Sequence, residues 1–232
     1  MERAEFDKFA DEYEALHRAN LAASGEAPEY FAEYKVRDLE RLLRARHPGG
    51  AALRLLDFGA GIGASIPFLR KYLPDAQITC VDVSARTLAV GVSRFARDAE
   101  CVAFDGARLP FGDSSFDCIF AGCVFHHVSP SAHHRLLGEF RRVLQHSGRL
   151  MIYEHNPLNP LTVRTVRACP FDDNAILLRA GILRAELERA GFENPEARYR
   201  VFFPRALRWL RPLEDALDWL PLGAQYYLTA TR

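Results

Sequence analysis

The sequence lacks any long hydrophobic run, and no stretch approaches the roughly 20 uninterrupted apolar residues that a membrane-spanning helix requires. The first five residues also lack the basic segment followed by an apolar one that marks a signal peptide. We therefore expect a cytoplasmic protein without stable membrane insertion.

Net charge is lacking as well, because thirty lysines and arginines balance thirty aspartates and glutamates. Without a global positive field we expect no nucleic-acid partner. A local excess of basic residues occurs late in the chain, at Arg198, Arg200, Arg205, Arg208 and Arg211. We interpret this excess as a solvated helix face, with an anionic substrate as the alternative.

Closely paired cysteines are also missing. The five cysteines lie far apart, at Cys80, Cys101, Cys118, Cys123 and Cys169. This spacing matches neither a disulfide framework nor a zinc site, so we expect buried free thiols. The adjacent residues His126 and His127 lie near Cys123, but neighbouring side chains on a strand or helix point in different directions. We therefore expect no metal site.

The sequence does contain a regular alternation of short apolar runs and amphipathic stretches, which favours a parallel sheet with crossover helices. The expected strands cover residues 53–58, 77–81, 100–104, 116–121, 149–153, 198–203 and 224–230. The expected helices cover residues 64–72, 85–97, 131–145 and 180–190. We predict an α/β fold with a doubly wound, mostly parallel seven-stranded sheet, in one domain over residues 1–232.

Three other segments carry less regular patterns. Residues 1–50 hold two amphipathic stretches and read as a helical cap, whereas prolines and asparagines predict an irregular segment over residues 154–173. Residues 205–220 are amphipathic and include Trp209 and Trp219. Their apolar side chains are expected mainly in the core, while a homodimer contact or a lipid-like substrate stays open.

A glycine-rich loop follows the first expected strand, where Gly59, Gly61 and Gly63 occupy every second position. Glycine lets the backbone turn sharply and approach a ligand without a Cβ atom in the way. Asp82 ends the second expected strand, where a carboxylate can accept hydrogen bonds from ribose hydroxyls. This arrangement predicts a nucleotide-like ligand.

The loop does not match the dinucleotide fingerprint well, because that pattern requires a third glycine three residues after the second. Ile66 occupies this position in one register, and Ala64 occupies it in the other, where alanine is sometimes accepted. Asp57 places a negative charge just before the loop, which suits an ammonium or sulfonium ligand better than a pyrophosphate.

Four linked motifs in the order LLDFGAGIGASIPFL, VDVS, FDGARLPFGDSSFDCIFAGCVFHHV and LGEFRRVLQHSGRLMI resemble class I S-adenosylmethionine-dependent methyltransferases. The N-terminal FDKFADEYEALH and the late AELERAGF are similar to this family too. The resemblance implies a Rossmann-like sheet, with a cofactor-binding core over residues 51–154 and a substrate-side segment over residues 155–232.

The resemblance also implies roles for individual residues around S-adenosylmethionine. Gly59, Ala60, Gly61 and Gly63 would surround its methionine part with Asp57 near the ammonium, Asp82 would hold the ribose, and Val83, Asp105 and Gly106 would contact adenine. Ala121 and Cys123 would line the opposite side. Separately from the resemblance, Tyr13 and Lys35 in the cap are candidates to close over the cofactor, with packing as the alternative role of Tyr13. A turn-capping Asp105 and a core Val83 remain the structural alternatives.

Methyl transfer chiefly requires alignment of the acceptor with the sulfonium methyl and exclusion of water. A base is needed only where the acceptor must lose a proton, and His126 or His127 is the expected catalytic residue. Glu154, His155 and Asn156 follow the fifth strand at the same sheet edge and are expected to bind substrate. We predict methyl transfer to a small molecule, with oxygen slightly favoured over nitrogen or carbon. A non-catalytic cofactor-binding or partner protein is the alternative.

Overall fold

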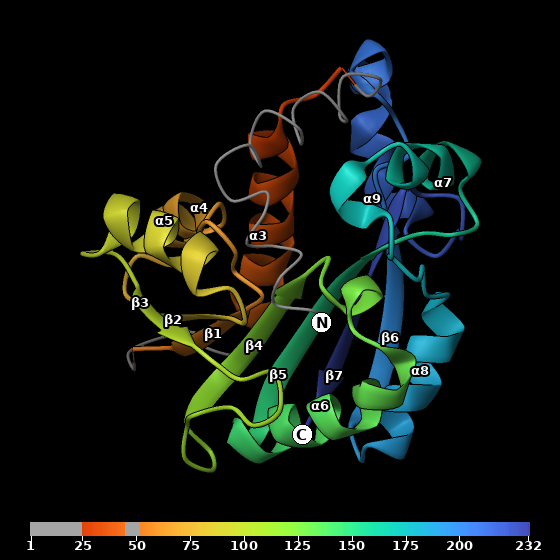
Figure 1. The fold of residues 1–232 in the computed structure, drawn as a ribbon. Helices are drawn as coiled ribbons and strands as arrows, with labels where there is room; N and C mark the ends of the chain where they lie inside the picture. The colour runs from red at the N-terminus through yellow and green to blue at the C-terminus, as the bar shows by residue number, and fades with distance from the viewer. Residues whose placement is uncertain (1–24, 45–51) are drawn as a thin grey trace.

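The computed structural model describes residues 25–44 and 52–232. Its centre is a seven-stranded sheet in the order β3-β2-β1-β4-β5-β7-β6 (Figure 1). The strands are β1 Arg54–Phe58, β2 Gln77–Asp82, β3 Glu100–Ala103, β4 Phe116–Gly122, β5 Leu144–His155, β6 Glu193–Arg200 and β7 Gln225–Thr231. Strands β1 to β5 pair in parallel, whereas β7 runs antiparallel to both β5 and β6. The predicted α/β fold with a mostly parallel seven-stranded sheet is therefore confirmed.

Helices cover both faces of the sheet (Figure 1). The longer helices are α3 Pro28–Arg44, α4 Ile66–Tyr72, α5 Ala85–Phe95, α6 Pro130–Val143, α7 Pro160–Arg167 and α8 Ala180–Arg189. The short helical segments are η2 Phe125–His127, η3 Pro170–Asp172, η4 Arg205–Leu213 and α9 Glu214–Leu217.

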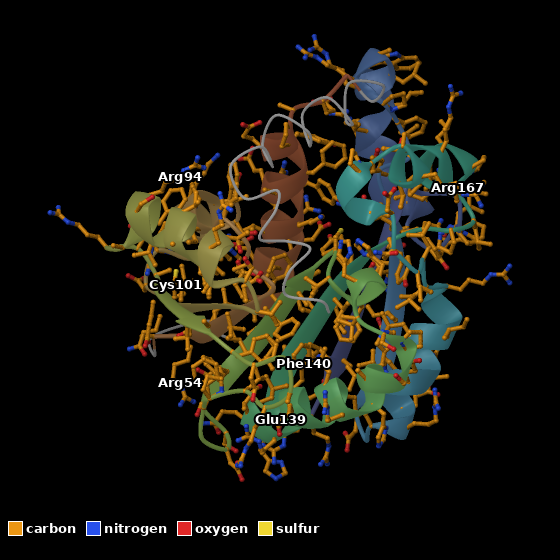
Figure 2. The ribbon with its side chains drawn as sticks, in the orientation of Figure 1. Arg54, Arg94, Cys101, Glu139, Phe140 and Arg167 are labelled. Carbon is orange, nitrogen blue, oxygen red and sulfur yellow. The ribbon has the colours of Figure 1, made fainter. Side chains whose placement is uncertain are left out.

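Alternation along the strands divides the core into two apolar layers. Leu55 of β1 packs in the layer with α3 and α4, while its neighbour Leu56 packs in the layer with α6 and α8. In the second layer the rings of Phe58 and Phe140 meet edge to face at 4.7 Å between centroids, and Figure 2 marks Phe140 at the sheet. Burial on both faces explains the nearly continuous apolar runs of the central strands.

Local sequence features fix the helix ends near the ligand-binding edge of the sheet. Ser84 caps α5, because its hydroxyl accepts a hydrogen bond from the Thr87 amide at 3.1 Å. Pro67 lies in the first turn of α4, where its missing N–H leaves no helical hydrogen bond unmade. Helix α5 therefore begins just after β2, and α4 begins just after the glycine loop that follows β1.

The segment 154–173 is more regular than the sequence predicts. Helix α7 forms there because the Asn159 side chain accepts hydrogen bonds from the amides of Leu161 and Thr162, and Pro160 starts the helix. The prediction took asparagine and proline only as breakers, whereas here they form a helix start. A prediction of irregular structure was wrong for the middle of this segment.

The expectation that residues 205–220 are mainly core is also wrong. Trp209 is 71% exposed and Trp219 is 68% exposed, while Leu213 is 53% exposed. The segment breaks into η4 and α9 around Pro212, so its apolar side chains do not form one stripe that faces the sheet. Within residues 25–44 and 52–232, no helix is both long and apolar enough to span a bilayer.

The expected N-terminal cap is described only in part. Helix α3 corresponds to the second amphipathic stretch, and it packs Phe31, Val36 and Leu39 into the core. The first stretch, with Tyr13, lies outside the described residues. The predicted role of Tyr13 therefore stays a prediction.

Candidate functional site

The glycine loop turns sharply between β1 and α4 at the carboxyl edge of the sheet. Gly59 has φ of +72° and Gly61 has φ of +53°, a region that favours glycine. A Cβ atom at Gly59 would collide with the Val124 side chain, whereas one at Gly61 would meet nothing within 4 Å. The backbone is thus pressed against the protein at Gly59 and faces open space at Gly61, as a ligand cradle requires.

Two acidic residues hold the loop and give it a negative charge. The Gly61 amide donates a hydrogen bond to Asp82 Oδ2 at 2.9 Å, and the Ser84 amide donates to Asp82 Oδ1 at the same distance. Asp57 is almost fully buried, and its Oδ2 atom has no hydrogen-bond partner in the described part of the chain. A buried orphan oxygen at this position fits a ligand that brings its own donors and positive charge.

The electrostatics of Asp57 support this interpretation. Burial and the neighbouring charge of Asp82 raise the pKa of Asp57 to about 7, and Lys35 offsets only part of the rise. A ligand ammonium would therefore meet an acidic group whose negative charge the protein offsets only in part. These residues fit the methionine ammonium that the resemblance assigns to Asp57.

The expected adenine contacts lie together beyond β2 and β3. Val83 is 3% exposed, and its side chain lies 3.6 Å from the position that a Cβ atom of Gly106 would take. Asp105 Oδ1 accepts hydrogen bonds from the amides of Ala107 at 2.7 Å and Arg108 at 3.0 Å. Asp105 thus caps a turn, and these bonds hold its pKa below the ordinary value. Its contact with adenine stays a prediction.

The opposite wall of the loop comes from the end of β4. Ala121 is fully buried in the sheet, so its side chain contributes only packing. Cys123 takes a positive φ of 60°, a strained conformation for a residue other than glycine, and Lys35 of α3 approaches its sulfur at 3.0 Å. Helix α3 therefore reaches over this side of the loop, as the predicted cap would.

A buried polar cluster follows Cys123 and gathers residues from three segments. His126 Nδ1 lies 2.6 Å from Glu154 Oε2, and Glu154 Oε1 accepts a hydrogen bond from the Phe125 amide at 2.7 Å. On the other side, Asp172 Oδ1 lies 3.7 Å from His126 Nε2 and 3.3 Å from His127 Nε2. The two adjacent histidines therefore converge on one carboxylate, contrary to the expectation that they diverge.

The cluster separates the two histidines electrostatically. Burial alone would lower the pKa of His126, but the charge of Glu154 and the hydrogen bonds with Asp172 and Glu154 raise it to about 10. Burial lowers the pKa of His127, and its hydrogen bond with Asp172 offsets only part of this effect. At neutral pH His126 is thus an imidazolium and His127 a neutral imidazole.

Both carboxylates of the cluster stay ionised. Burial opposes the charge of each, yet the charge and hydrogen bond of His126 hold the pKa of Glu154 below its ordinary value. Hydrogen bonds from His126 and His127 do the same for the pKa of Asp172. Asp172 was not among the residues that the sequence suggested, because an aspartate in a proline-rich segment carries no spacing signal toward a distant histidine pair.

The three residues expected to bind substrate take different positions. Glu154 and Asn156 are buried, and the side-chain amide of Asn156 donates hydrogen bonds to the carbonyls of Pro221 and Gly223 at 3.2 and 2.7 Å. His155 is partly exposed, its ring meets that of His126 at 5.1 Å, and burial lowers its pKa to about 3. Glu154 and Asn156 therefore make buried hydrogen bonds within the protein, and the predicted contact of these three residues with substrate stays a prediction.

His126, His127 and Asp172 each offer one ligand atom within 4.8 Å of the others, so the group resembles a metal site in composition. Glu154 contacts His126 at Nδ1, so the Nε2 atom of this ring is the one that faces Asp172 and the rest of the group.

Comparison with known proteins agrees with this geometry. Residues 56–152, which carry the loop, Asp82 and the histidine pair, match the model of a methyltransferase domain. The chain is 32% identical over 154 residues to the demethylmenaquinone methyltransferase of Thermotoga maritima, covering 66% of this chain and 61% of that protein. It is 36% identical over 142 residues to the malonyl-[acyl-carrier protein] O-methyltransferase of Geobacter sulfurreducens, covering 58% of this chain and 49% of the relative. The chain thus spans half to three fifths of the length of these curated relatives.

The fold has a counterpart over nearly its whole length. A Thermotoga maritima structure described as an S-adenosylmethionine-dependent methyltransferase, possible histamine N-methyltransferase, aligns with a TM-score of 0.69. The alignment covers 99% of each chain at 19% identity, so it concerns the fold alone. Residues 56–152 therefore carry a methyltransferase domain, and the chain is similar to a methyltransferase over about two thirds of its length.

Proposed function

We propose that this protein transfers the methyl group of S-adenosylmethionine to an oxygen atom of a small molecule, with His127 as the general base. The observation that carries the proposal is the buried cluster of His126, His127, Glu154 and Asp172 directly beside the glycine loop. Val124 packs against Gly59, and both histidines follow Val124 within three residues. The histidine cluster therefore lies next to the glycine loop.

His127 is the better base of the two histidines. His126 is 2% exposed and already holds a proton between Glu154 and Asp172, so it has no lone pair to offer. His127 is neutral, and its side chain is 13% exposed, which leaves an approach from outside. A neutral imidazole is the form that accepts a proton from an acceptor hydroxyl.

Asp172 positions the base. Asp172 Oδ1 lies 3.3 Å from His127 Nε2, a contact that favours the proton on Nε2. The same carboxylate stabilises the imidazolium that forms once His127 accepts a second proton. Asp172 is therefore a positioning residue, and the pair has the geometry of a base with an orienting carboxylate.

The reaction is a single displacement with a simple atom balance. When bound, S-adenosylmethionine supplies an electrophilic methyl group on a sulfonium sulfur and leaves as the neutral thioether. A lone pair of the acceptor oxygen forms the new bond to carbon, the hydroxyl proton passes to His127 Nδ1, and the carbon–sulfur electron pair returns to sulfur. Asp57, Asp82 and the loop hold the donor, while the cluster aligns the acceptor.

The acceptor class is inferred from this chemistry and from the relatives. A hydroxyl proton must leave during methylation of a hydroxyl oxygen, which gives a buried base a task. One relative is named for methyl transfer to oxygen, whereas the other is named for a demethylmenaquinone acceptor. Methylation of a carbon atom that is activated by loss of a neighbouring hydroxyl proton would use the same base. A product methylated on carbon is therefore the alternative outcome of the test.

The test compares wild type with His127→Ala and Asp172→Asn, using methyl-labelled S-adenosylmethionine and a small-molecule extract. A general base contributes about 10²–10⁴-fold, so His127→Ala should lower turnover by that factor with nearly unchanged cofactor affinity. Asp172→Asn should lower kcat more than it raises KM. The wild-type rate should rise with pH through a value below 6.5, because burial holds the pKa of His127 below that ordinary value. Full activity of His127→Ala would remove the base, and cofactor binding without any labelled product would favour a non-catalytic protein.

A further inference from the structure

Large apolar side chains are exposed on α7, on η4 and in the turns next to α7 and α9, and Figure 1 draws α7 and α9 at the same end of the molecule. Leu161 of α7 is 72% exposed, and Trp209 of η4 is 71% exposed. The same end carries Leu158, Leu213, Trp219 and Leu222, which are all exposed. We call these six residues and their elements the apolar end. Exposed patches of such side chains mark interaction sites.

Hydrogen bonds hold α7 to the turn before β7 and hold α9 to the segment before η4. Asn159 at the start of α7 donates to the carbonyl of Leu222 at 2.8 Å, and the Thr162 hydroxyl donates to the carbonyl of Ala224 at 2.9 Å. Buried Glu214 anchors α9 by accepting from the amides of Phe202 and Phe203 at 3.1 and 3.2 Å. The exposed side chains therefore stand on a fixed framework.

Arginines accompany these apolar side chains. Arg164 and Arg167 lie on α7, where they border a groove of about 560 Å³ with Leu158, and Figure 2 marks Arg167 at this end. Arg208 lies beside Trp209 in η4. All three are exposed, and none makes an ion pair within the described parts of the chain. Residues 158–167 and 205–222 together hold five arginines against three acidic residues, Glu214, Asp215 and Asp218, so the local charge is positive although the chain as a whole is neutral.

We propose that the apolar end docks the protein on the surface of an anionic lipid bilayer. Tryptophan and leucine side chains enter the boundary between headgroups and acyl chains, while arginines at the same level contact lipid phosphates. Trp219 suits this environment, because its indole N–H already donates to the Ala216 carbonyl at 3.1 Å and needs no water. The contact is peripheral and involves no spanning segment.

A lipid surface fits better than an acidic protein. Arginines alone would serve a protein partner, but such a partner does not account for several large apolar side chains spread over two helical elements and a loop. The apolar end is also connected to the candidate site along the chain, because α7 is followed by η3, which carries Asp172. Docking would place the segment that carries Asp172 near the bilayer, where an acceptor dissolved in lipid would arrive.

The two tryptophans provide a direct readout, because they are the only ones in the chain and both lie at the apolar end. We expect their fluorescence to shift to the blue when the full chain meets vesicles of phosphatidylglycerol and phosphatidylcholine, and to quench with brominated acyl chains. Trp209→Phe and Trp219→Phe assign the shift to each residue. No cofactor or acceptor is present, so the result is independent of the proposed methyl transfer.

Charge reversal tests the arginines. An arginine near an anionic surface contributes about five-fold to binding, so Arg164→Glu with Arg208→Glu should weaken vesicle co-sedimentation by about 25-fold or more. The control is Arg97→Glu with Arg184→Glu, two exposed arginines away from the apolar end, which should bind like wild type. Salt should weaken wild-type binding as well.

Each other outcome overturns the proposal. Absence of a shift and of co-sedimentation with anionic vesicles excludes lipid docking. Equal binding to vesicles of phosphatidylcholine alone removes the arginine contacts. A blue shift that depends on protein concentration without vesicles shows that a second copy covers the apolar end. Binding to an acidic carrier protein, with none to vesicles, identifies a protein partner.

Discussion

Replacement of Asp57 by asparagine should stabilise the free protein at alkaline pH while it weakens cofactor binding. The pKa of Asp57 is about 7 in the folded protein against an ordinary value of 3.8. This acid therefore contributes stability that is present below pH 4 and is lost as the pH rises to 7. At 1.36 kcal/mol per pKa unit, the charged carboxylate lowers the free energy of unfolding by about 4 kcal/mol above pH 7.

Asparagine removes this pH-dependent loss but leaves a buried amide at the position of the unpartnered Oδ2 atom. An unsatisfied polar group costs about 1–3 kcal/mol, so the net gain at pH 8 should be about 1–3 kcal/mol. The difference between mutant and wild type is the sharper quantity, because the fixed cost cancels. It should increase by about 3 kcal/mol between pH 5 and pH 8.

Urea unfolding of both proteins at pH 5, 6, 7 and 8 measures this difference, and exposed Asp75→Asn serves as the control. Calorimetry on the same samples should show S-adenosylmethionine affinity reduced by about 1–3 kcal/mol in Asp57→Asn, since the ammonium loses its counter-charge. A mutant whose stability differs from wild type by the same amount at every pH would refute the reasoning, as would unchanged cofactor affinity.

Three further predictions follow from the same contacts. Asp82→Ala should weaken cofactor affinity by about 1–3 kcal/mol, measured by calorimetry, and a folded mutant with wild-type affinity would move the ribose site elsewhere. Gly59→Ala should unfold at a lower urea concentration than Gly61→Ala, because only a Cβ atom at position 59 meets Val124. Gly61→Ala should lose about 1–2 kcal/mol of stability and should also bind the cofactor more weakly. Equal stability and equal cofactor affinity of the two mutants would contradict the placement of Gly61 on the ligand side of the loop. Glu154→Gln should destabilise the protein by about 3 kcal/mol and lower the pKa of His126, followed by NMR titration, and an unshifted imidazole would reject the ion pair.

The sheet could be predicted from the sequence because parallel strands buried on both faces leave a continuous apolar signal, and because the glycines and Asp82 mark the turns that follow the first two strands. The η4 and α9 segment could not, since amphipathic periodicity alone does not state whether the apolar side faces the core or solvent. Its exposure depends on the break at Pro212 and on tertiary contacts such as that of Glu214.

The candidate site was predictable only where one motif supplied it. His126 and His127 follow a strand directly, so their place at the sheet edge could be inferred. Asp172 reaches them from a distant segment through η3, and its role depends on a contact that neither sequence position signals. The difference between the histidines likewise arises from Glu154 on the neighbouring strand, because one of its oxygens contacts His126 while the other accepts from the Phe125 amide.

Isothermal titration of the purified chain with S-adenosylmethionine, its demethylated product and NAD tests the central claim most directly. Asp57 and the missing third glycine disfavour a pyrophosphate, so we expect both S-adenosyl compounds to bind and NAD to give no heat. Tight NAD binding without any response to S-adenosylmethionine would contradict the account.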